Sequence, residues 1–111
     1  MGSDPMVFTI KDIYMKNKEK ILERTETLIA EGQKFVDNAM FQFATAGSQE
    51  FQILQTWLGQ VLLLINVALP SSHPFRKQAA YYFSGGGSLG AQGMMSLLMS
   101  LAIEIKAGTM D

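Results

Sequence analysis

Apolar residues recur every seven positions through the first part of the chain, in two parallel rows. The rows are Tyr14, Ile21, Leu28 and Phe35, and then Leu22, Ile29, Val36 and Phe43. Seven residues are about two turns of an α-helix, so the rows form one apolar stripe opposite a charged face. The pattern predicts one long helix over residues 10–43, or two consecutive helices. Gly32 falls inside it, but a single glycine costs a helix only about 1 kcal/mol relative to alanine, which favours a continuous helix.

The middle of the chain predicts a second, largely apolar helix. Ser48 is a favourable N-cap, and Glu50 follows it in the first turn, where a carboxylate suits the helix dipole. The helix is expected to end at Pro70, because proline lacks the N–H group that a continuing helix needs. Since apolar residues occupy most of its sides, we expect this helix to lie at the centre of the fold.

Two further signals divide the remaining residues into a third and a fourth helix. Ser72 is expected to cap a short helix that runs to about Phe83, where Ser84-Gly85-Gly86-Gly87 ends it. Ser88 is then expected to cap a last amphipathic helix that ends at Gly108. The sequence therefore predicts an all-α fold, a compact bundle of about four helices.

Length and composition fit one such domain. The chain has 111 residues, of which 48% are hydrophobic and 17% charged, as expected for a globular domain with a single core. Residues 7–111 are expected to form this domain, and residues 1–6 look like a cloning remnant because they lack the apolar core of a signal peptide. No stretch reaches the roughly 20 uninterrupted apolar residues of a membrane-spanning helix, and residues 61–69 are expected to be buried.

Charge and residue types exclude several classes of function. A net charge of -1 argues against attachment to DNA and leaves a small anion as the more plausible charged ligand. The absence of cysteine removes disulfide and thiolate chemistry and fits a cytoplasmic location. With one histidine in the chain and no carboxylate from residue 51 to 103, acid–base pairs and metal-ligand sets are lacking. We therefore expect a binding domain and not an enzyme, with no cofactor and no metal.

Gly85, Gly87 and Gly90 match the GxGxxG spacing of dinucleotide-binding turns. That fingerprint requires a preceding strand, a βαβ unit and an acidic residue about 20 positions further on, and the sequence has none of these. Close packing of a neighbouring helix is the favoured explanation for the glycines. A ligand phosphate at the start of the last helix is the alternative.

Arg76 and Lys77 are the only charged residues from position 51 to 103. His73 lies one helical turn before Arg76, and in the first turns of a helix a cation opposes the dipole at a cost of about 0.3 to 1 kcal/mol. A bound anion would offset this cost, because backbone N–H groups, dipole and side chains would all favour it, with Ser72 as a further donor. This predicts a phosphate site. Alternatively, the two cations are solubilising surface charges and His73 only caps the helix.

Four aromatic residues follow in the same segment: Phe75, Tyr81, Tyr82 and Phe83. Exposed rings can stack on nucleic-acid bases, as they do in single-strand binding proteins. An aromatic run on a short helix is more often part of the core, and we expect this of at least two of the four.

Three segments together suggest a known family: Leu28-Ile29-Ala30-Glu31-Gly32-Gln33, then Glu50-Phe51-Gln52 with Trp57, then His73-Pro74-Phe75 before a glycine-rich turn. The combination resembles a small helical domain of prokaryotic defence and nucleotide-signalling proteins, over about residues 21–108. Within that group the chain is most similar to the soluble C-terminal portion of membrane-anchored type III CRISPR ancillary effectors that sense cyclic tetra-adenylate. It departs from the usual pattern in its central helix, which holds more leucine and less charge.

The resemblance implies a sensor domain that transmits a signal and performs no chemistry. Cyclic tetra-adenylate would be the partner of Ser72, His73, Arg76 and Lys77, and a membrane segment would precede Val7, which makes this the cytoplasmic domain of an inner-membrane protein. Four equivalent phosphates are met most economically by four equivalent subunits, so a homotetramer is expected. The alternative is a structural homo-oligomerisation or adaptor domain of a defence protein with no nucleotide ligand, which the apolar second half of the chain favours.

Overall fold

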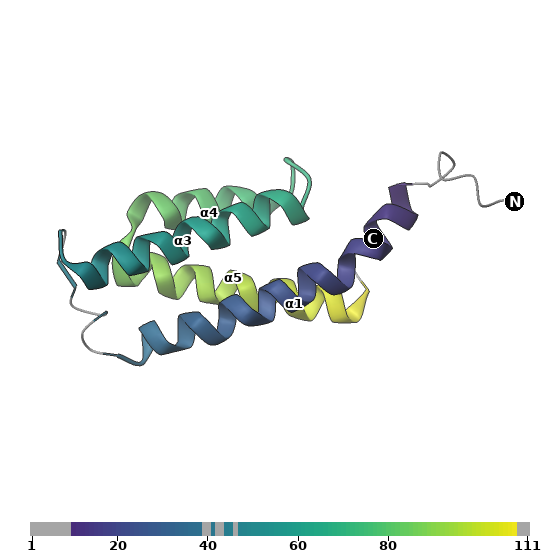
Figure 1. The fold of residues 1–111 in the computed structure, drawn as a ribbon. Helices are drawn as coiled ribbons and strands as arrows, with labels where there is room; N and C mark the ends of the chain where they lie inside the picture. Colours follow the sequence, from purple (N-terminus) through teal and green to yellow (C-terminus); the bar gives the residue numbers. More distant parts are fainter. Residues whose placement is uncertain (1–9, 39–40, 42–43, 46, 109–111) are drawn as a thin grey trace, which may run out of the picture.

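The computed structural model describes residues 10–38, 41, 44–45 and 47–108, which are helical apart from the connections and contain no strand. Four helices follow one another along the chain: α1 (Ile10–Val36), α3 (Gln49–Ala68), α4 (Pro74–Gly85) and α5 (Gly87–Ala107). Successive helices run in opposite directions, so that α3 and α5 are parallel (Figure 1). The expected all-α, four-helix fold is confirmed.

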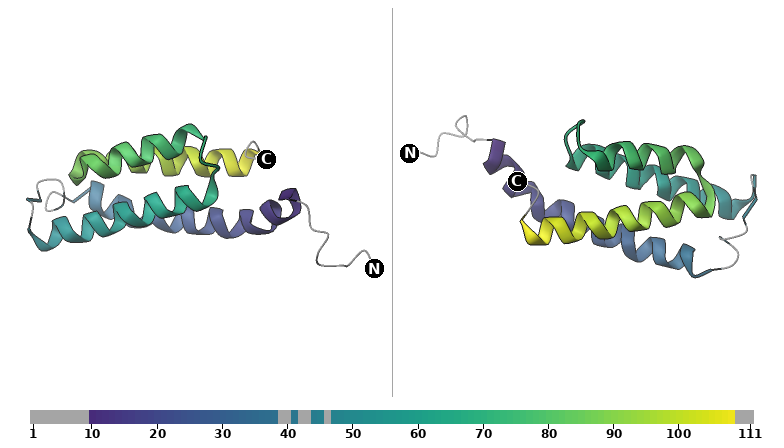
Figure 2. Two further views of the ribbon diagram at one scale, coloured as in Figure 1. Left: turned by 90° about the horizontal axis from the view of Figure 1, so that it is seen from above. Right: turned by 180° about the vertical axis from the view of Figure 1, so that it is seen from behind.

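The four helices pack in a two-by-two arrangement, in which α3 and α5 lie diagonally opposite and contact each other. Each of these two helices contacts the other three, whereas α1 and α4 make no contact with each other among the described residues. The first turns of α1 extend past the ends of the other helices (Figure 2). The strongly charged helix α1 and the helix that carries Arg76 and Lys77 therefore lie at opposite corners of the bundle.

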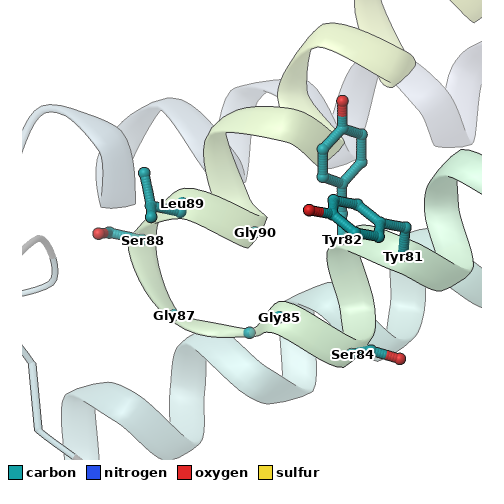
Figure 3. A pocket seen from close by; sticks show the side chains of 9 residues that line it. Tyr81, Tyr82, Ser84, Gly85, Gly87, Ser88, Leu89 and Gly90 are labelled. Carbon is teal, nitrogen blue, oxygen red and sulfur yellow. The ribbon is translucent and has the colours of Figure 1, made fainter.

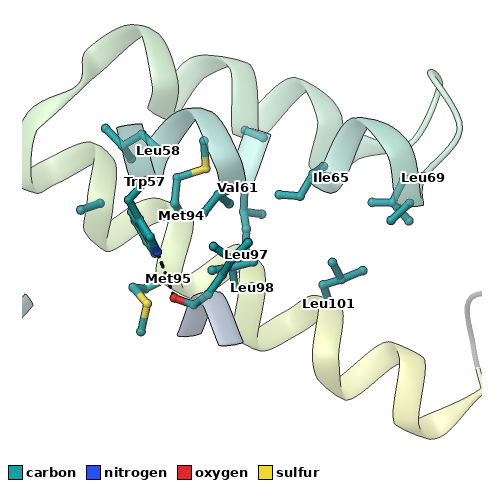
Figure 4. Packing of buried hydrophobic residues seen from close by; sticks show 14 of the residues in the cluster. Trp57, Leu58, Val61, Ile65, Leu69, Met94, Met95, Leu97, Leu98 and Leu101 are labelled. Carbon is teal, nitrogen blue, oxygen red and sulfur yellow. Dashed lines mark hydrogen bonds between the residues drawn. The ribbon is translucent and has the colours of Figure 1, made fainter. Parts of the chain in front are cut away.

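The core lies where α3 and α5 face each other and α1. Its largest fully buried side chains are Trp57, Leu28, Leu54, Leu58, Ile65, Met94, Leu98 and Leu101. Figure 4 shows the packing of α3 against α5 around Trp57, Met94 and Leu98. The expected central position of the second helix is confirmed, and α5 shares that position. Burial of one such side chain contributes about 1.5 to 3 kcal/mol, so this cluster is the main source of stability.

The inner stripe of α1 contains two residues that are not hydrophobic. It steps along the helix by four and three residues, through Ile21, Thr25, Leu28, Gly32 and Phe35. Thr25 is fully buried, and its hydroxyl donates a hydrogen bond of 2.6 Å to the carbonyl oxygen of Ile21. This local bond satisfies the hydroxyl inside the core.

Helix α1 continues through Gly32, as predicted, but it ends earlier than the apolar rows suggest. Its last residue is Val36, and the N–H of Asn38 bonds to the carbonyl oxygen of Phe35 at 3.3 Å in a tighter turn. Asp37 and Asn38 favour such turns because their side chains compete for backbone hydrogen bonds. Phe43, the last member of the second row, lies outside the described residues.

Of the three predicted serine caps, one is confirmed and two are wrong. The Ser48 hydroxyl accepts the N–H of Phe51 at 3.1 Å. At α4 the cap is His73 and not Ser72, because the helix begins one residue later than predicted, at Pro74. At α5 the cap is Gly86 and not Ser88, and the side chain of Gln55 accepts the N–H of Gly87 at 3.2 Å. Gly108 ends α5 in the left-handed conformation, as expected.

Two of the glycines at the start of α5 allow it to lie close to α4. A Cβ atom on Gly90 would meet the backbone carbonyl oxygen of Tyr82, and one on Gly93 would meet the Tyr82 ring. Close helix packing therefore accounts for the last glycine of the GxGxxG match. No strand precedes that match in the described part of the chain.

By length and composition, α3 and α5 are each also apolar enough to cross a membrane. Neither helix contains roughly 20 uninterrupted apolar residues, because polar residues interrupt both, and so the sequence pattern alone does not indicate them. In the bundle, 33% of the apolar window of α3 and 50% of that of α5 are buried. Core helices of soluble proteins meet the same criteria, so this pattern assigns no location.

Candidate functional site

The α3–α4 turn forms a groove that gathers all four predicted ligand-binding residues. Its volume is about 690 Å³. It is lined by Leu62, Asn66, Ser71, Ser72, His73, Pro74, Arg76, Lys77 and Ala80. The lining residues come from α3, from the turn after it and from the start of α4. The two helices run antiparallel to each other (Figure 1).

Arg76 has a structural partner that the sequence did not predict. Its Nη1 donates a hydrogen bond of 3.2 Å to the carbonyl oxygen of Leu69, the C-cap residue of α3. A cation at a helix C-terminus is favourable, because the unpaired carbonyls there carry partial negative charge. The position of Arg76 near the start of α4 therefore needs no anion to offset the dipole of that helix.

The backbone N–H groups at the start of α4 are also already used. Pro74 has no N–H, the N–H of Phe75 bonds to Nδ1 of His73 at 3.1 Å, and the N–H of Arg76 bonds to the carbonyl oxygen of His73 at 3.1 Å. The expectation that these N–H groups would hold an anion is therefore wrong for the first turn. In the first turn of α4, an anion would therefore be bound by side chains.

His73 nevertheless retains one donor on its ring. Because Nδ1 accepts the N–H of Phe75, it carries no proton, and the ring proton lies on Nε2. The ring also packs edge-on against the Phe75 ring, with centroids 4.8 Å apart, which fixes its orientation. His73 therefore caps α4, as the alternative interpretation predicts, and its second ring nitrogen remains available as a donor.

The groove has positive charge without a carboxylate in its lining. Arg76 and Lys77 contribute two cations, and no carboxylate is among the other lining residues. Lys77 is exposed, while His73 and Arg76 are half-buried. Half of the acidic residues of the chain lie on α1, which does not contact α4 among the described residues.

Asn66 and Leu62 line the groove from α3 and were missed by the sequence analysis. Asn66 had a usable signal, because it is the only polar residue between Val61 and Leu69. A half-buried amide in an apolar helix usually has a polar partner or borders a polar surface. Which surface it borders follows only from the antiparallel packing of α4 against α3.

A second groove of about 760 Å³ lies at the other end of α4. Tyr81, Tyr82 and Ser84 line it from α4, and the turn and first residues of α5, 85–90, complete it (Figure 3). It contains no charged residue. Among the described residues, no group of three or more His, Asp or Glu side chains is arranged to hold a metal ion.

Three of the residues on which the suggested family resemblance rests, Leu28, Gly32 and Trp57, pack together in the core. The indole N–H of Trp57 donates to the carbonyl oxygen of Leu28, and Gly32 makes room for the indole ring. Comparison of the chain with family models, with curated proteins and with solved structures finds no match.

Proposed function

We propose that this domain is a non-catalytic sensor that binds the phosphate groups of a cyclic oligoadenylate in the groove at the α3–α4 turn. The observation that carries the proposal is the convergence of Ser72, His73, Arg76 and Lys77 on one groove without a carboxylate. Phosphate oxygens are acceptors with negative charge, so they suit a lining of hydroxyl, imidazole and cationic donors. Cyclic tetra-adenylate is the specific ligand that the family resemblance suggests.

The sequence predicts Arg76 as the main phosphate contact, with Lys77 and His73 as supporting donors, and we now assign these roles differently. Lys77 becomes the main contact, because it is exposed, whereas one Nη of Arg76 is bonded to Leu69. Arg76 retains other N–H groups for a ligand, since a guanidinium has five N–H donors. His73 contributes Nε2, and Ser72 its hydroxyl. The protein performs no bond-making step in this scheme and acts through binding alone.

Calorimetric titration with cyclic tetra-adenylate tests the proposal. Lys77→Ala should weaken binding about ten-fold or more, because a charge-assisted hydrogen bond contributes roughly 1.5 to 3 kcal/mol. Lys34→Ala is the matched control: Lys34 is exposed on α1, the helix that does not touch α4, and its removal should leave affinity unchanged. Titration with an uncyclised tetra-adenylate shows whether the ring itself matters.

Equal affinity of Lys77→Ala and the unchanged protein would contradict the assignment of the groove. An equal loss with Lys34→Ala would mean that only the overall charge of the protein is sensed. Raising the salt concentration should weaken specific binding as well, because neutralised phosphates release counterions.

A second function is favoured by the exposed apolar side chains of α3 and α5. Leu63 and Val67 are 65% and 72% exposed on α3, and Leu89 and Ile103 are 79% and 67% exposed on α5. Such exposed apolar residues suit an oligomerisation or adaptor domain. Under this proposal Val67→Glu or Ile103→Glu disrupts assembly measured by sedimentation, whereas Lys77→Ala leaves it intact.

A further inference from the structure

We propose that Tyr81 and the glycine-rich turn beside it form a subsite for a nucleobase, so that the base of a nucleotide stacks on the Tyr81 ring when its phosphate lies at Lys77. The inference rests on the proposed function, because Lys77 supplies the phosphate end. It adds the part of the ligand that is recognised and the residue that recognises it.

The exposure of Tyr81 is the first step. Phe75, Tyr82 and Phe83 pack against the hydrophobic core, as expected for most of the aromatic run, but the Tyr81 side chain is 76% exposed. One ring of the run therefore remains available on the surface. An exposed aromatic face is the feature on which bases stack, and stacking tolerates any base because each has a π-face.

Tyr82 connects α5 to Tyr81, because it packs against two glycines of α5 on one side and against the Tyr81 ring on the other. Gly90 and Gly93 bring α5 directly against the backbone and ring of Tyr82. The Tyr82 ring in turn lies edge-on to Tyr81, with centroids 5.7 Å apart and an interplanar angle of 69°. Figure 3 shows the Tyr81 side chain extending from α4 towards the first turn of α5 at Gly90. The exposed ring is therefore supported by a fixed neighbour.

The chemistry of this groove suits a base better than a phosphate. Its lining has two phenol rings, the Leu89 side chain, the hydroxyls of Ser84 and Ser88, and backbone, with no cation. Ligand pockets that bind planar groups are typically apolar with a few polar groups that fix the orientation. Its volume of about 760 Å³ also leaves room for a purine.

The spacing between the two grooves connects them. Lys77 and Tyr81 are four residues apart on α4 and both exposed, so they are neighbours on one helix face with a rise of about 6 Å between them. Ala80 lines the groove at the α3–α4 turn, and the next residue, Tyr81, lines the second groove. A phosphate at Lys77 thus places the attached nucleoside next to the Tyr81 ring.

The test compares cyclic tetra-adenylate with the same ribose-phosphate ring lacking its bases, by calorimetry. Tyr81→Leu should weaken cyclic tetra-adenylate between about 5-fold and 150-fold, the contribution of one stacked base, and should leave the abasic ring unaffected. Tyr81→Phe keeps the ring and should bind cyclic tetra-adenylate within about two-fold of the unchanged protein, since stacking needs the π-face and not the hydroxyl. Circular dichroism checks that each variant is folded.

Unchanged affinity of Tyr81→Leu for cyclic tetra-adenylate would overturn the base subsite, as would an equal loss for both rings. The two proposals fail separately: an abasic ring that binds through Lys77 while Tyr81 has no effect supports only the groove at the α3–α4 turn. Binding that depends on Tyr81 and not on Lys77 would overturn that groove and the coupling between the sites. If neither cyclic tetra-adenylate nor the abasic ring bound to the protein, both proposals would be overturned.

Discussion

Trp57 and Leu28 are joined by a hydrogen bond of 3.0 Å, from the indole N–H on α3 to a backbone carbonyl oxygen of α1. The bond lies within the core, where an unsatisfied indole N–H would be costly (Figure 4). It is possible because Gly32, one turn after Leu28, has no side chain. A Cβ atom at that position would overlap the six-membered ring of the indole and would lie 2.5 Å from Sδ of Met95.

Gly32→Ala should therefore destabilise the protein although alanine is the better helix former. Overpacking of a filled core typically costs about 1 to 3 kcal/mol, and the roughly 1 kcal/mol gained from helix propensity leaves a net loss of up to about 2 kcal/mol. Gly59→Ala is the matched control, because a Cβ there would lie 3.7 Å from the Phe83 ring, an ordinary contact. We expect it to stabilise the fold by about 0.5 to 1 kcal/mol. Urea denaturation compares the two, and a stable Gly32→Ala variant would show that the indole can move.

Trp57→Phe should lower the free energy of unfolding and also reduce the cost of Gly32→Ala. Phenylalanine lacks the N–H that reaches Leu28 and the ring atoms that a side chain at position 32 would meet, whereas Met95 would still obstruct it. The two substitutions should consequently be coupled, and the double variant should be more stable than additivity predicts by roughly 0.5 to 3 kcal/mol. A double-mutant cycle followed by circular dichroism measures this coupling. Strict additivity would place the indole and residue 32 out of contact.

Arg76→Ala should destabilise the unliganded protein by about 0.5 to 1.5 kcal/mol, the net value of an ordinary hydrogen bond. The reason is the bond from Nη1 to Leu69, which caps α3 and holds the start of α4 against its end. Lys77→Ala, on an exposed side chain, should change stability by less than about 0.5 kcal/mol. Thermal unfolding without ligand separates the two. Equal stability of both variants would mean that Arg76 contributes nothing to the turn, and its role would then lie in binding alone.

Local chemistry explains which features of the fold could be predicted from the sequence. Ser48 and Gly108 act on the helix that they adjoin, so their capping roles are visible in the sequence and are confirmed. Gln55 satisfies the start of α5 from a different helix, and such a cap is invisible until the packing is known. For the same reason Thr25 and Gly32 were not assigned to the inner face of α1, although the seven-residue spacing located that face.

The candidate site shows the same division. Ser72, His73, Arg76 and Lys77 come together because they are adjacent in the sequence and share one turn and one helix start. The bond between Arg76 and Leu69 depends on how α4 folds back along α3, which no local pattern encodes. In the sequence, the two isolated cations indicate an anion site. Arg76 instead has a structural partner in Leu69, whereas Lys77 has no structural partner among the described contacts.

Two glycines of the GxGxxG match, Gly85 and Gly90, give a last prediction, because we expect them to respond in opposite ways. Gly90→Ala should destabilise the protein by about 1 to 3 kcal/mol, because its Cβ would lie 2.5 Å from the backbone carbonyl oxygen of Tyr82, which cannot rotate away as a side chain can. Gly85→Ala meets nothing within 4 Å and should be neutral or stabilising by up to about 1 kcal/mol. Urea denaturation of both variants provides the measurement. If Gly90→Ala were as stable as Gly85→Ala, α5 would have to lie further from α4, and the support that Tyr82 gives to Tyr81 would be lost with that close contact.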